Sequence, residues 1–241
     1  MILDNLLNDS NEIIIKVLES INKQQSLLLT YLNQHCFNIY YEDVNYRKVL
    51  DSKFLIYQAD FGVYLSLKFL FKKKIDRIDA TEMNQLILDE LIKTKESLVF
   101  VGGNFEDKFV REESQKRSIN LISYHPGYFD ESITNEVLLE LSKKNSQVYL
   151  IGMGVPKQEI FAAQLAQKVE NGVIICVGSF LEYYLGTKKR THVFFRETGL
   201  EWFFRLITEP SRMWKRYLIG IPLFVYRVCK LKSKNFSLIS Q

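Results

Sequence analysis

A glycine turn between an apolar run and a polar helical segment is the strongest chemical signal in the chain. Residues 148–151 form a short β-branched and aromatic run, Gly152-Met-Gly154 follows it, and Pro156 precedes helical periodicity over residues 157–169. Glycines let the backbone approach an anion closely, and the free N–H groups and dipole of a helix N-terminus attract negative charge. This order predicts a phosphate-binding loop, although the same order can build a tight turn without a ligand.

The first turn of that expected helix carries three hydrogen-bonding side chains, Lys157-Gln158-Glu159. A turn with no ligand does not require such a cluster. Gln158 is therefore a candidate for hydrogen bonding to a sugar or to the catalytic centre, with helix capping as its alternative role. Glu159 and Pro156 are candidate substrate-binding residues in the same loop.

Asp60 is the best candidate for acid–base chemistry. It follows the apolar run 53–58, and ligands of an open parallel sheet bind outside the carboxyl ends of its strands. A carboxylate there can take a proton from an attacking hydroxyl group. The alternative role is an Asx turn that begins a helix. Other expected strands also end in polar or glycine residues, which we expect to touch a flat, phosphate-bearing ligand unless they only close turns: Asn33, Gly102, Gly103, Gly127, Tyr128, Gly152, Gly154 and Gly178.

Apolar runs alternate with helical segments along the chain and position these residues. Strands are predicted at residues 26–32, 53–58, 97–103, 119–124, 148–151 and 172–177. Helices are predicted at residues 11–25, 43–51, 63–72, 131–144 and 157–169, with a further helix capped by Thr81 and a charged helix that ends near Arg117. This alternation predicts an α/β fold, a mainly parallel sheet covered by helices on both faces.

Composition excludes several classes of protein. The 241 residues are 47% hydrophobic and 25% charged, as in an ordinary globular protein. The three cysteines form no Cys-x-x-Cys pair and indicate reduced thiols in the cytosol, and the three histidines lack the spacing of a metal site, so we expect no metal and no cofactor. The N-terminus lacks the pattern of a signal peptide, and no apolar run approaches the roughly 18 residues that span a bilayer.

The C-terminal end is strongly basic, although the whole chain has a net charge of only +4. Twelve basic and three acidic residues fall within 188–241, interleaved with aromatic and aliphatic ones. This pattern is typical of a helix that lies in a membrane interface. Packing on the protein's own sheet is the alternative, and nucleic acid is a weaker one because no nucleic-acid module is legible. We therefore divide the chain into a ligand-binding domain, 1–187, and a basic amphipathic appendage, 188–241.

Three motifs together resemble the WecG/TagA/CpsF glycosyltransferases, family 26 of these enzymes. They are Gly152-Met-Gly-Val-Pro-Lys-Gln-Glu159, Val177-Gly178, and Gly199-Leu-Glu-Trp-Phe-Phe-Arg205 with Glu209-Pro-Ser-Arg212. Residues 77–83, Arg-Ile-Asp-Ala-Thr-Glu-Met, are similar to the family's Arg-Val-x-Gly-x-Asp-Leu. The resemblance extends from about Ser26 to Phe224.

The resemblance implies a Rossmann-like, doubly wound fold and an inverting, metal-independent transfer of an N-acetylhexosamine or hexose from a UDP-sugar. It implies a polyprenyl-diphosphate-linked acceptor at the cytoplasmic face of the membrane, and a product for teichoic acid, capsule or exopolysaccharide. Asp60 would be the base, and Asn33 and Gln158 would assist it. Thr30 and Arg77 would bind substrate, and the residues that would hold the lipid diphosphate are Arg205, Arg212, Lys215 and Arg216.

The chain departs from the family pattern at several of these positions. Two residues rather than one separate Thr30 from Asn33. The family's catalytic aspartate lies in Asp-Gly-x-Gly, whereas this chain has Ala59-Asp60-Phe61-Gly62. Either Asp60 is the base after a one-residue deletion, or Ala59 replaces it and the enzyme is weak or altered. Ala80 stands in place of a glycine, Glu82 in place of an aspartate, and Lys215 in place of a third arginine.

Two other functions remain open on the sequence. A nucleotide-dependent oxidoreductase would also use glycine turns after strands, but the chain lacks Gly-x-Gly-x-x-Gly. A non-catalytic partner in polysaccharide assembly would tolerate the altered aspartate motif. The identity of the sugar and acceptor is not fixed, and a homo-oligomer also remains open.

Overall fold

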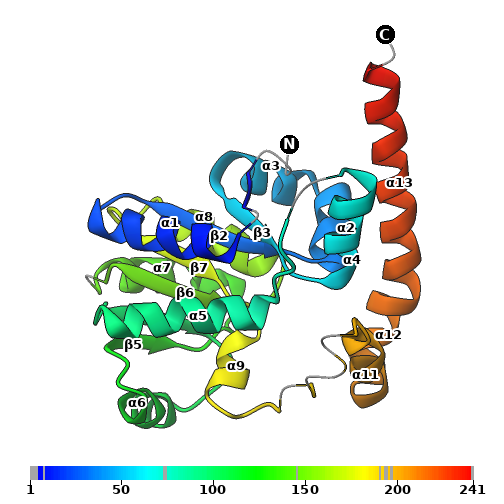
Figure 1. Ribbon diagram of the computed structural model, residues 1–241. Coiled ribbons are helices and arrows are strands. Elements are labelled where there is room, and N and C mark those ends of the chain that lie inside the picture. The colour runs from blue at the N-terminus through cyan, green and yellow to red at the C-terminus, as the bar shows by residue number, and fades with distance from the viewer. Residues whose placement is uncertain are drawn as a thin grey trace.

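A single parallel sheet forms the centre of the protein in the computed structural model, which describes residues 5–7, 9–72, 75–144, 146–189, 191–192, 195 and 198–239. Its seven strands lie in the order β1-β3-β2-β7-β6-β4-β5, and every described pair is parallel (Figure 1). The strands are β1 (Leu6–Leu7), β2 (Leu27–Leu32), β3 (Leu55–Gln58), β4 (Leu98–Gly102), β5 (Leu121–His125), β6 (Val148–Gly152) and β7 (Val173–Cys176). This confirms the predicted α/β fold.

Helices cover both faces of the sheet. One face packs against α1 (Ser10–Asn22), α5 (Ala80–Lys93), α6 (Asp107–Lys116) and α9 (Phe180–Tyr184). The other packs against α2 (Gln34–Glu42), α3 (Val44–Lys53), α4 (Phe61–Leu65), α7 (Thr134–Ser142) and α8 (Lys157–Leu165), with the short turns η1 (Ser66–Leu70) and η2 (Glu131–Ile133) between helices. Alternate residues of each strand enter the two apolar cores: Val99 and Val101 belong to one, Leu98 and Phe100 to the other.

The chain leaves the neighbouring strands β2 and β7 on opposite faces of the sheet. After β2 it enters α2, which packs on one face, and after β7 it enters α9, which packs on the other. Loops that leave two neighbouring strands in opposite directions open a crevice at their carboxyl ends, which is where ligands bind in doubly wound sheets. The turns after β2, β3 and β7 are therefore the positions that matter for function.

The C-terminal segment consists of α11 (Glu201–Thr208), α12 (Pro210–Trp214), the π-helical turn η3 (Lys215–Ile219) and α13 (Gly220–Ile239). Figure 1 shows α13 running beside α2 and continuing beyond the body of the protein. Its inner face is buried through Phe224, Arg227 and Val228. In the described part of the chain, none of the helices combines the length and apolar character that crossing a bilayer requires.

Three elements and one cap differ from the sequence predictions, and one of these elements is the short helix α9, which was not predicted. Helix α2 was not predicted, because its mixture of polar and aromatic residues has no clear apolar stripe. Strand β1 was also missed, since it contributes only two residues opposite Ile56 and Tyr57. The prediction that Thr81 caps its helix was wrong: Asp79 is the cap of α5, and its carboxylate accepts a hydrogen bond from the backbone N–H of Glu82 (3.0 Å).

Candidate active site

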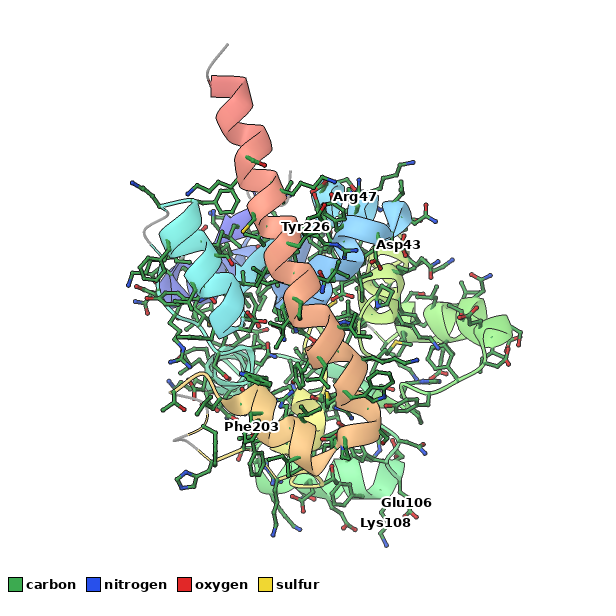
Figure 2. The ribbon with its side chains drawn as sticks, turned by 90° about the vertical axis from the view of Figure 1, so that its right-hand side faces the viewer. Asp43, Arg47, Glu106, Lys108, Phe203 and Tyr226 are labelled. Atoms are coloured by element: carbon green, nitrogen blue, oxygen red, sulfur yellow. The ribbon has the colours of Figure 1, made fainter. Side chains whose placement is uncertain are left out.

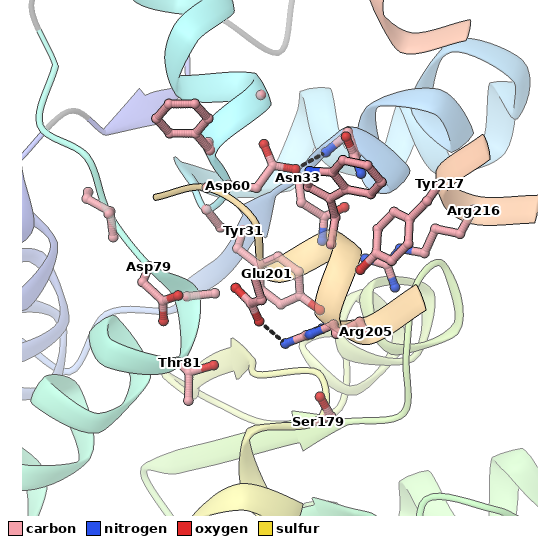
Figure 3. Close-up of a pocket in the computed structure, with 18 of the residues that line it drawn as sticks. Tyr31, Asn33, Asp60, Asp79, Thr81, Ser179, Glu201, Arg205, Arg216 and Tyr217 are labelled. Carbon is pink, nitrogen blue, oxygen red and sulfur yellow. Dashed lines mark hydrogen bonds and ion pairs between the residues drawn. The ribbon is translucent and has the colours of Figure 1, made fainter. Parts of the chain in front are cut away.

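A cavity of about 300 Å³ opens at the carboxyl ends of β2, β3 and β7 (Figure 3). The sheet contributes Asn33 and Asp60, the loop before α5 contributes Arg77, and the C-terminal helices close the opposite side with Arg205, Arg212 and Arg216. Six of the candidate residues, which are up to 183 positions apart in the sequence, therefore line one cavity. A nucleotide-sugar or a lipid diphosphate would meet one carboxylate and four guanidinium groups from this candidate set.

Asp60 caps α4 and holds its carboxylate at the cavity wall. One carboxylate oxygen accepts a hydrogen bond from the backbone N–H of Val63 (2.7 Å), and the other accepts one from the backbone N–H of Gln34 (2.6 Å). Loss of contact with water raises the pKa of Asp60, the two N–H donors and Arg216 oppose that rise, and Glu201 adds to it. Two fixed donors orient the carboxylate, while a raised pKa makes it a better proton acceptor.

Asn33 stands beside Asp60 at the end of β2. Its side-chain oxygen accepts a hydrogen bond from the backbone N–H of Cys36 (2.9 Å), so it caps the N-terminus of α2. Its side-chain amide nitrogen is the part that remains for a ligand. Because α2 begins directly after Asn33, the N–H of Gln34 is directed at Asp60, and the helix that the sequence did not predict positions the Asp60 carboxylate.

The arginines differ in how they are engaged. Arg205 forms an ion pair with Glu201, and Arg212 lies 2.9 Å from a carboxylate oxygen of Glu209. The guanidinium carbon of Arg77 lies 5.2 Å from the centre of the Phe61 ring. The buried Nε atoms of Arg205 and Arg216 both lack a hydrogen-bond partner among the described residues. Arg216 differs from Arg205 because it forms no ion pair among those residues, and its charge acts on Asp60. Arg216 is therefore the cavity arginine best placed to take an anionic ligand.

Several cavity residues were not singled out from the sequence. Tyr31, at the end of β2, and Tyr217, in η3, face the cavity, and so do the carboxylates of Asp79 and Glu201 (Figure 3). Asp79 and Glu201 lie within motifs that were compared with the family, so proximity to Arg77 and Arg205 was the signal that could have identified them. Both carboxylates already have partners, Glu82 N–H for Asp79 and Arg205 for Glu201.

The glycines after β4, β5, β6 and β7 pack against one another. A Cβ on Gly102 would lie 2.6 Å from the carbonyl oxygen of Gly152, and one on Gly152 would lie 2.4 Å from that of Gly178. Likewise, a Cβ on Gly127 would lie 2.8 Å from the Cα of Gly102. Their small size lets the strand ends approach closely, which gives these glycines a structural role whether or not they touch a ligand.

Two of the predicted loop glycines have distinct surroundings. Gly103 has φ +65°, and a Cβ there would collide with the ring of Phe105 at 2.3 Å. Gly154 has φ +80°, and a Cβ there would meet no atom within 4 Å. Gly154 is therefore the glycine of the turn whose surroundings leave open space for a ligand.

Gln158 and Glu159 lie behind the cavity wall instead of in it, and both side chains are fully buried. The side-chain oxygen of Gln158 accepts a hydrogen bond from the backbone N–H of Gly178 (3.1 Å), and its amide donates to Glu159 (2.8 Å). The hydroxyl of Thr30 donates to the same Glu159 oxygen (2.8 Å). Gln158 and Glu159, expected to bind a ligand or to assist catalysis, are therefore buried outside the cavity lining, where their contacts tie β2, α8 and the turn after β7 together.

Burial changes the acidity of this network. The second carboxylate oxygen of Glu159 has no hydrogen-bond partner among the described residues. Burial raises the pKa of Glu159 to about 7, although hydrogen bonds from Gln158 and Thr30 oppose the rise. The hydroxyl of Tyr31 is close to Gly178, whose Cβ would lie 2.4 Å from it, so the network also supports the cavity residue Tyr31.

Three other candidates lie outside the cavity lining. Lys215 is exposed, with its ammonium group 5.4 Å from the centre of the Trp214 ring. Tyr128 is 71% exposed on the loop after β5. Pro156 directly precedes α8 as its N-terminal cap residue. Across the described residues, no three His, Cys, Asp or Glu side chains gather where they could hold a metal ion.

The fold and the site define a class: a doubly wound α/β enzyme with a carboxylate and an arginine cluster at the carboxyl ends of its strands. A model of the glycosyl transferase WecG/TagA/CpsF family matches residues 3–237, and the chain belongs to that family. It is therefore a glycosyltransferase, as the sequence motifs indicated.

Two relatives show the extent of the similarity. The chain is 27% identical over 195 residues to the N-acetylglucosaminyldiphosphoundecaprenol N-acetyl-beta-D-mannosaminyltransferase of Bacillus spizizenii, which covers 78% of this chain and 73% of the relative. It is 35% identical over 124 residues to the protein of the same name from Staphylococcus aureus strain NCTC 8325 / PS 47. That second match covers 50% of this chain and 46% of the relative.

Proposed function

We propose that this enzyme transfers a sugar from a UDP-sugar to a sugar carried on a polyprenyl diphosphate, with inversion at the transferred anomeric carbon. The observation that supports it best is the shared cavity, in which Asp60 of the sheet faces Arg205, Arg212 and Arg216 of the C-terminal helices. One side of that cavity has the group that sugar transfer needs, and the other has groups that bind diphosphate.

In the proposed reaction Asp60 takes the proton of the acceptor hydroxyl. The hydroxyl oxygen attacks the anomeric carbon of the donor, and the bond from that carbon to the UDP oxygen breaks. UDP leaves with the bonding electron pair, so negative charge grows on its β-phosphate. Arginine side chains already placed where that charge develops stabilise it well, and Arg216 is the cavity arginine whose Nε is unpartnered and whose guanidinium forms no ion pair among the described residues. We propose this as a metal-independent reaction, in which guanidinium groups supply the positive charge.

The names of the two relatives guide the choice of substrates. Both act, by name, on N-acetylglucosaminyldiphosphoundecaprenol and transfer N-acetylmannosamine. We propose an N-acetylmannosamine-like donor, with another N-acetylhexosamine or a hexose as the alternative. The acceptor would belong to the synthesis of a bacterial surface polysaccharide, such as teichoic acid, capsule or exopolysaccharide.

We also propose that the enzyme works at the inner face of the cell membrane, where α11 to α13 contact the lipid surface. Large apolar side chains are exposed along these helices, among them Phe203, Ile207, Trp214, Leu218 and Val225. Phe203 on α11 and Tyr226 on α13 lie on the same side of the molecule (Figure 2). Basic residues accompany them, and anionic lipid attracts each basic residue near its surface by about 1 kcal/mol.

The test is the transfer of a radiolabelled sugar from UDP to a polyprenyl-diphosphate-linked N-acetylglucosamine, with and without a chelator. We expect transfer to survive chelation and to fall by about 100-fold or more in Asp60→Asn. Asp79→Asn is the matched control, because it changes another cavity carboxylate that already caps a helix. Absence of transfer from every UDP-sugar, or full activity in Asp60→Asn, would contradict the proposal.

The second candidate function is a weakened enzyme that binds the sugar nucleotide within a polysaccharide assembly complex. The observation that favours it is Ala59 beside Asp60 in the cavity lining, because the family motif can be aligned with its aspartate at position 59. Ala59→Asp distinguishes the two: a large gain in turnover would support the weakened enzyme, and a loss would support Asp60 as the base.

A further inference from the structure

A second cavity, of about 410 Å³, lies next to the first one, between α2, α4 with η1, and α13. Apolar side chains supply most of its wall, including Phe37 of α2, Leu67 of η1, and Phe224 and Val228 of α13. A volume of this size lies within the range of about 300–1,000 Å³ that small-molecule sites have. The second cavity is therefore large enough to bind a ligand, and the proposed transfer reaction does not use it.

The polar groups in this wall are largely engaged with the protein itself. The guanidinium of Arg47 donates hydrogen bonds to the carbonyl oxygens of Tyr40 (3.0 Å) and Tyr41 (2.6 Å). The hydroxyl of Ser66 donates to the carbonyl oxygen of Gly62 (2.8 Å). Because these groups are already paired, the cavity favours a hydrocarbon over a polar ligand.

The two cavities meet at α4 and at the start of α13. Gly62 lines the first cavity and Val63 the second, while Ile221 lines the first and Phe224, one helical turn later, lines the second. A Cβ at Gly62 would lie 3.5 Å from the carboxylate of Asp60 and 3.6 Å from the ring of Phe224. The charged site therefore passes into an apolar one within a single helical turn.

We propose that the second cavity binds the first isoprene units of the lipid-linked acceptor, next to the diphosphate. This inference rests on the proposed function, in which Arg216 and its neighbours hold that diphosphate. In a polyprenyl diphosphate the hydrocarbon begins directly at the phosphate, as the adjacent charged and apolar cavities require. A phospholipid fits less well, because polar ester groups separate its phosphate from its acyl chains.

Binding of the isoprenoid chain in the second cavity would keep its hydrocarbon out of water. The chain must pass from the membrane to a diphosphate held at the sheet, and any part of it in water is unfavourable. Each methylene group removed from water is worth roughly fourfold in affinity. Phe224, Val228 and Leu231 are spaced four and three residues apart and line the cavity from one face of α13, so its apolar wall continues along that helix away from the first cavity.

Val228→Phe tests the inference, because it fills the cavity from the buried face of α13. Val44→Phe on α3 is the matched control: the same change at a side chain that is 53% exposed and outside the lining of both cavities. Both are compared on two acceptors in detergent micelles, one with a full isoprenoid chain and one whose diphosphate carries only a methyl group. We expect Val228→Phe to raise KM for the isoprenoid acceptor by about tenfold, with kcat and the KM of the methyl acceptor unchanged. Equal effects on both acceptors, or none on either, would overturn it.

A direct measurement separates this inference from the proposed function. An isoprenyl diphosphate with a photoreactive diazirine in its first unit should label peptides that contain Val63–Leu67 or Phe224–Leu231. Labelling elsewhere, or its loss on adding excess phospholipid, would overturn the inference even if sugar transfer is intact. Absence of transfer with intact labelling would instead refute the proposed function alone. If Val228→Phe melts too early to assay, Leu231→Trp fills the same cavity from a partly buried position.

Discussion

Arg227, near the middle of α13, is buried against Asn38 of α2 and joins the C-terminal helix to the body. One guanidinium nitrogen donates to the backbone oxygen of Asn38 (2.9 Å) and to its side-chain oxygen (3.2 Å), and the other forms an ion pair with Glu42. The Asn38 amide in turn donates to the carbonyl oxygen of Gly220 at the start of α13 (2.8 Å). Since α13 lines both cavities, this contact sets the shape of each.

Arg227→Ala should loosen α13 and lower the free energy of unfolding by about 1–3 kcal/mol, because it leaves the buried oxygens of Asn38 without donors. Hydrogen–deuterium exchange should show faster exchange over residues 220–232 than elsewhere. Transfer to a lipid-linked acceptor should fall more than binding of UDP-sugar. Lys232→Ala, an exposed change on the same helix, is the control. Unchanged protection of α13 in Arg227→Ala would show that this contact does not hold the helix.

Arg216 and Lys215 are neighbours in the sequence, but only Arg216 lines the cavity. Arg216→Ala should therefore raise KM for the diphosphate-linked acceptor by about 10–100-fold, as expected when a charge-assisted hydrogen bond is lost. Lys215→Ala should leave KM nearly unchanged. Equal losses in the two variants would mean that Arg216 acts only through overall charge.

The same pair of variants tests the acidity of Asp60. Arg216 opposes the rise in the pKa of Asp60, so removing it should raise that pKa further. A general base must be deprotonated, and the rate therefore falls as pH drops through its pKa. The acidic limb of the kcat/KM profile should move to higher pH in Arg216→Ala and stay in place in Lys215→Ala. A limb that moves in neither variant, or in both, would remove Asp60 as its source.

Sequence patterns predicted the sheet and part of the cavity lining because both depend on local order. Apolar runs fixed the six main strands, and residues directly after a strand, such as Asn33 and Asp60, had to lie at its carboxyl end. The orientation of Gln158 and Glu159 depends on contacts far along the chain. Glu159 is buried because Thr30, 129 positions away, donates a hydrogen bond to it. A charged residue on a first helical turn is ordinarily exposed, so periodicity alone favoured the wrong side of α8.

The buried Glu159 should make the stability of the protein depend on pH. Its pKa is about 7 in the folded protein against an ordinary 4.5, so the unfolded chain releases this proton at lower pH than the folded one does. The contribution of Glu159 to the free energy of unfolding is therefore fully present below pH 4.5. It is lost as the pH rises through 7, by up to about 3 kcal/mol. Urea unfolding measures this effect. Between pH 5 and pH 7.5 the free energy of unfolding of the wild type should fall more than that of Glu159→Gln.

Glu159→Gln keeps the shape of the side chain and its ability to accept from Thr30, but it cannot titrate. The matched control is Glu112→Gln on α6, an exposed glutamate whose substitution should leave the pH dependence unchanged. If wild type and Glu159→Gln show the same change between the two pH values, Glu159 is ionised in the folded protein at both. The unpaired carboxylate oxygen would then have a partner such as water.

The exposed apolar residues of α11 should decide how well the protein binds a lipid surface. Phe203 and Ile207 are 46% and 64% exposed and lie four residues apart, hence on one side of the helix. The double change Phe203→Ser with Ile207→Ser should reduce partition onto anionic liposomes by roughly tenfold or more, because two large side chains no longer leave water. Flotation of the liposomes measures the bound fraction.

The control variant replaces two exposed leucines on the body of the protein by serine, Leu86 of α5 and Leu139 of α7, which are 47% and 49% exposed. This control variant loses a comparable apolar surface. If any loss of exposed apolar surface weakened liposome binding, the control would bind as weakly as the α11 variant. If α11 makes a specific lipid contact, the control should float with the liposomes like wild type. Raised salt should weaken wild-type binding through screening of the basic residues, while the apolar term persists. If the two double variants float equally, or if a chain truncated near Thr191 floats as well as the full chain, the lipid contact lies away from α11 to α13.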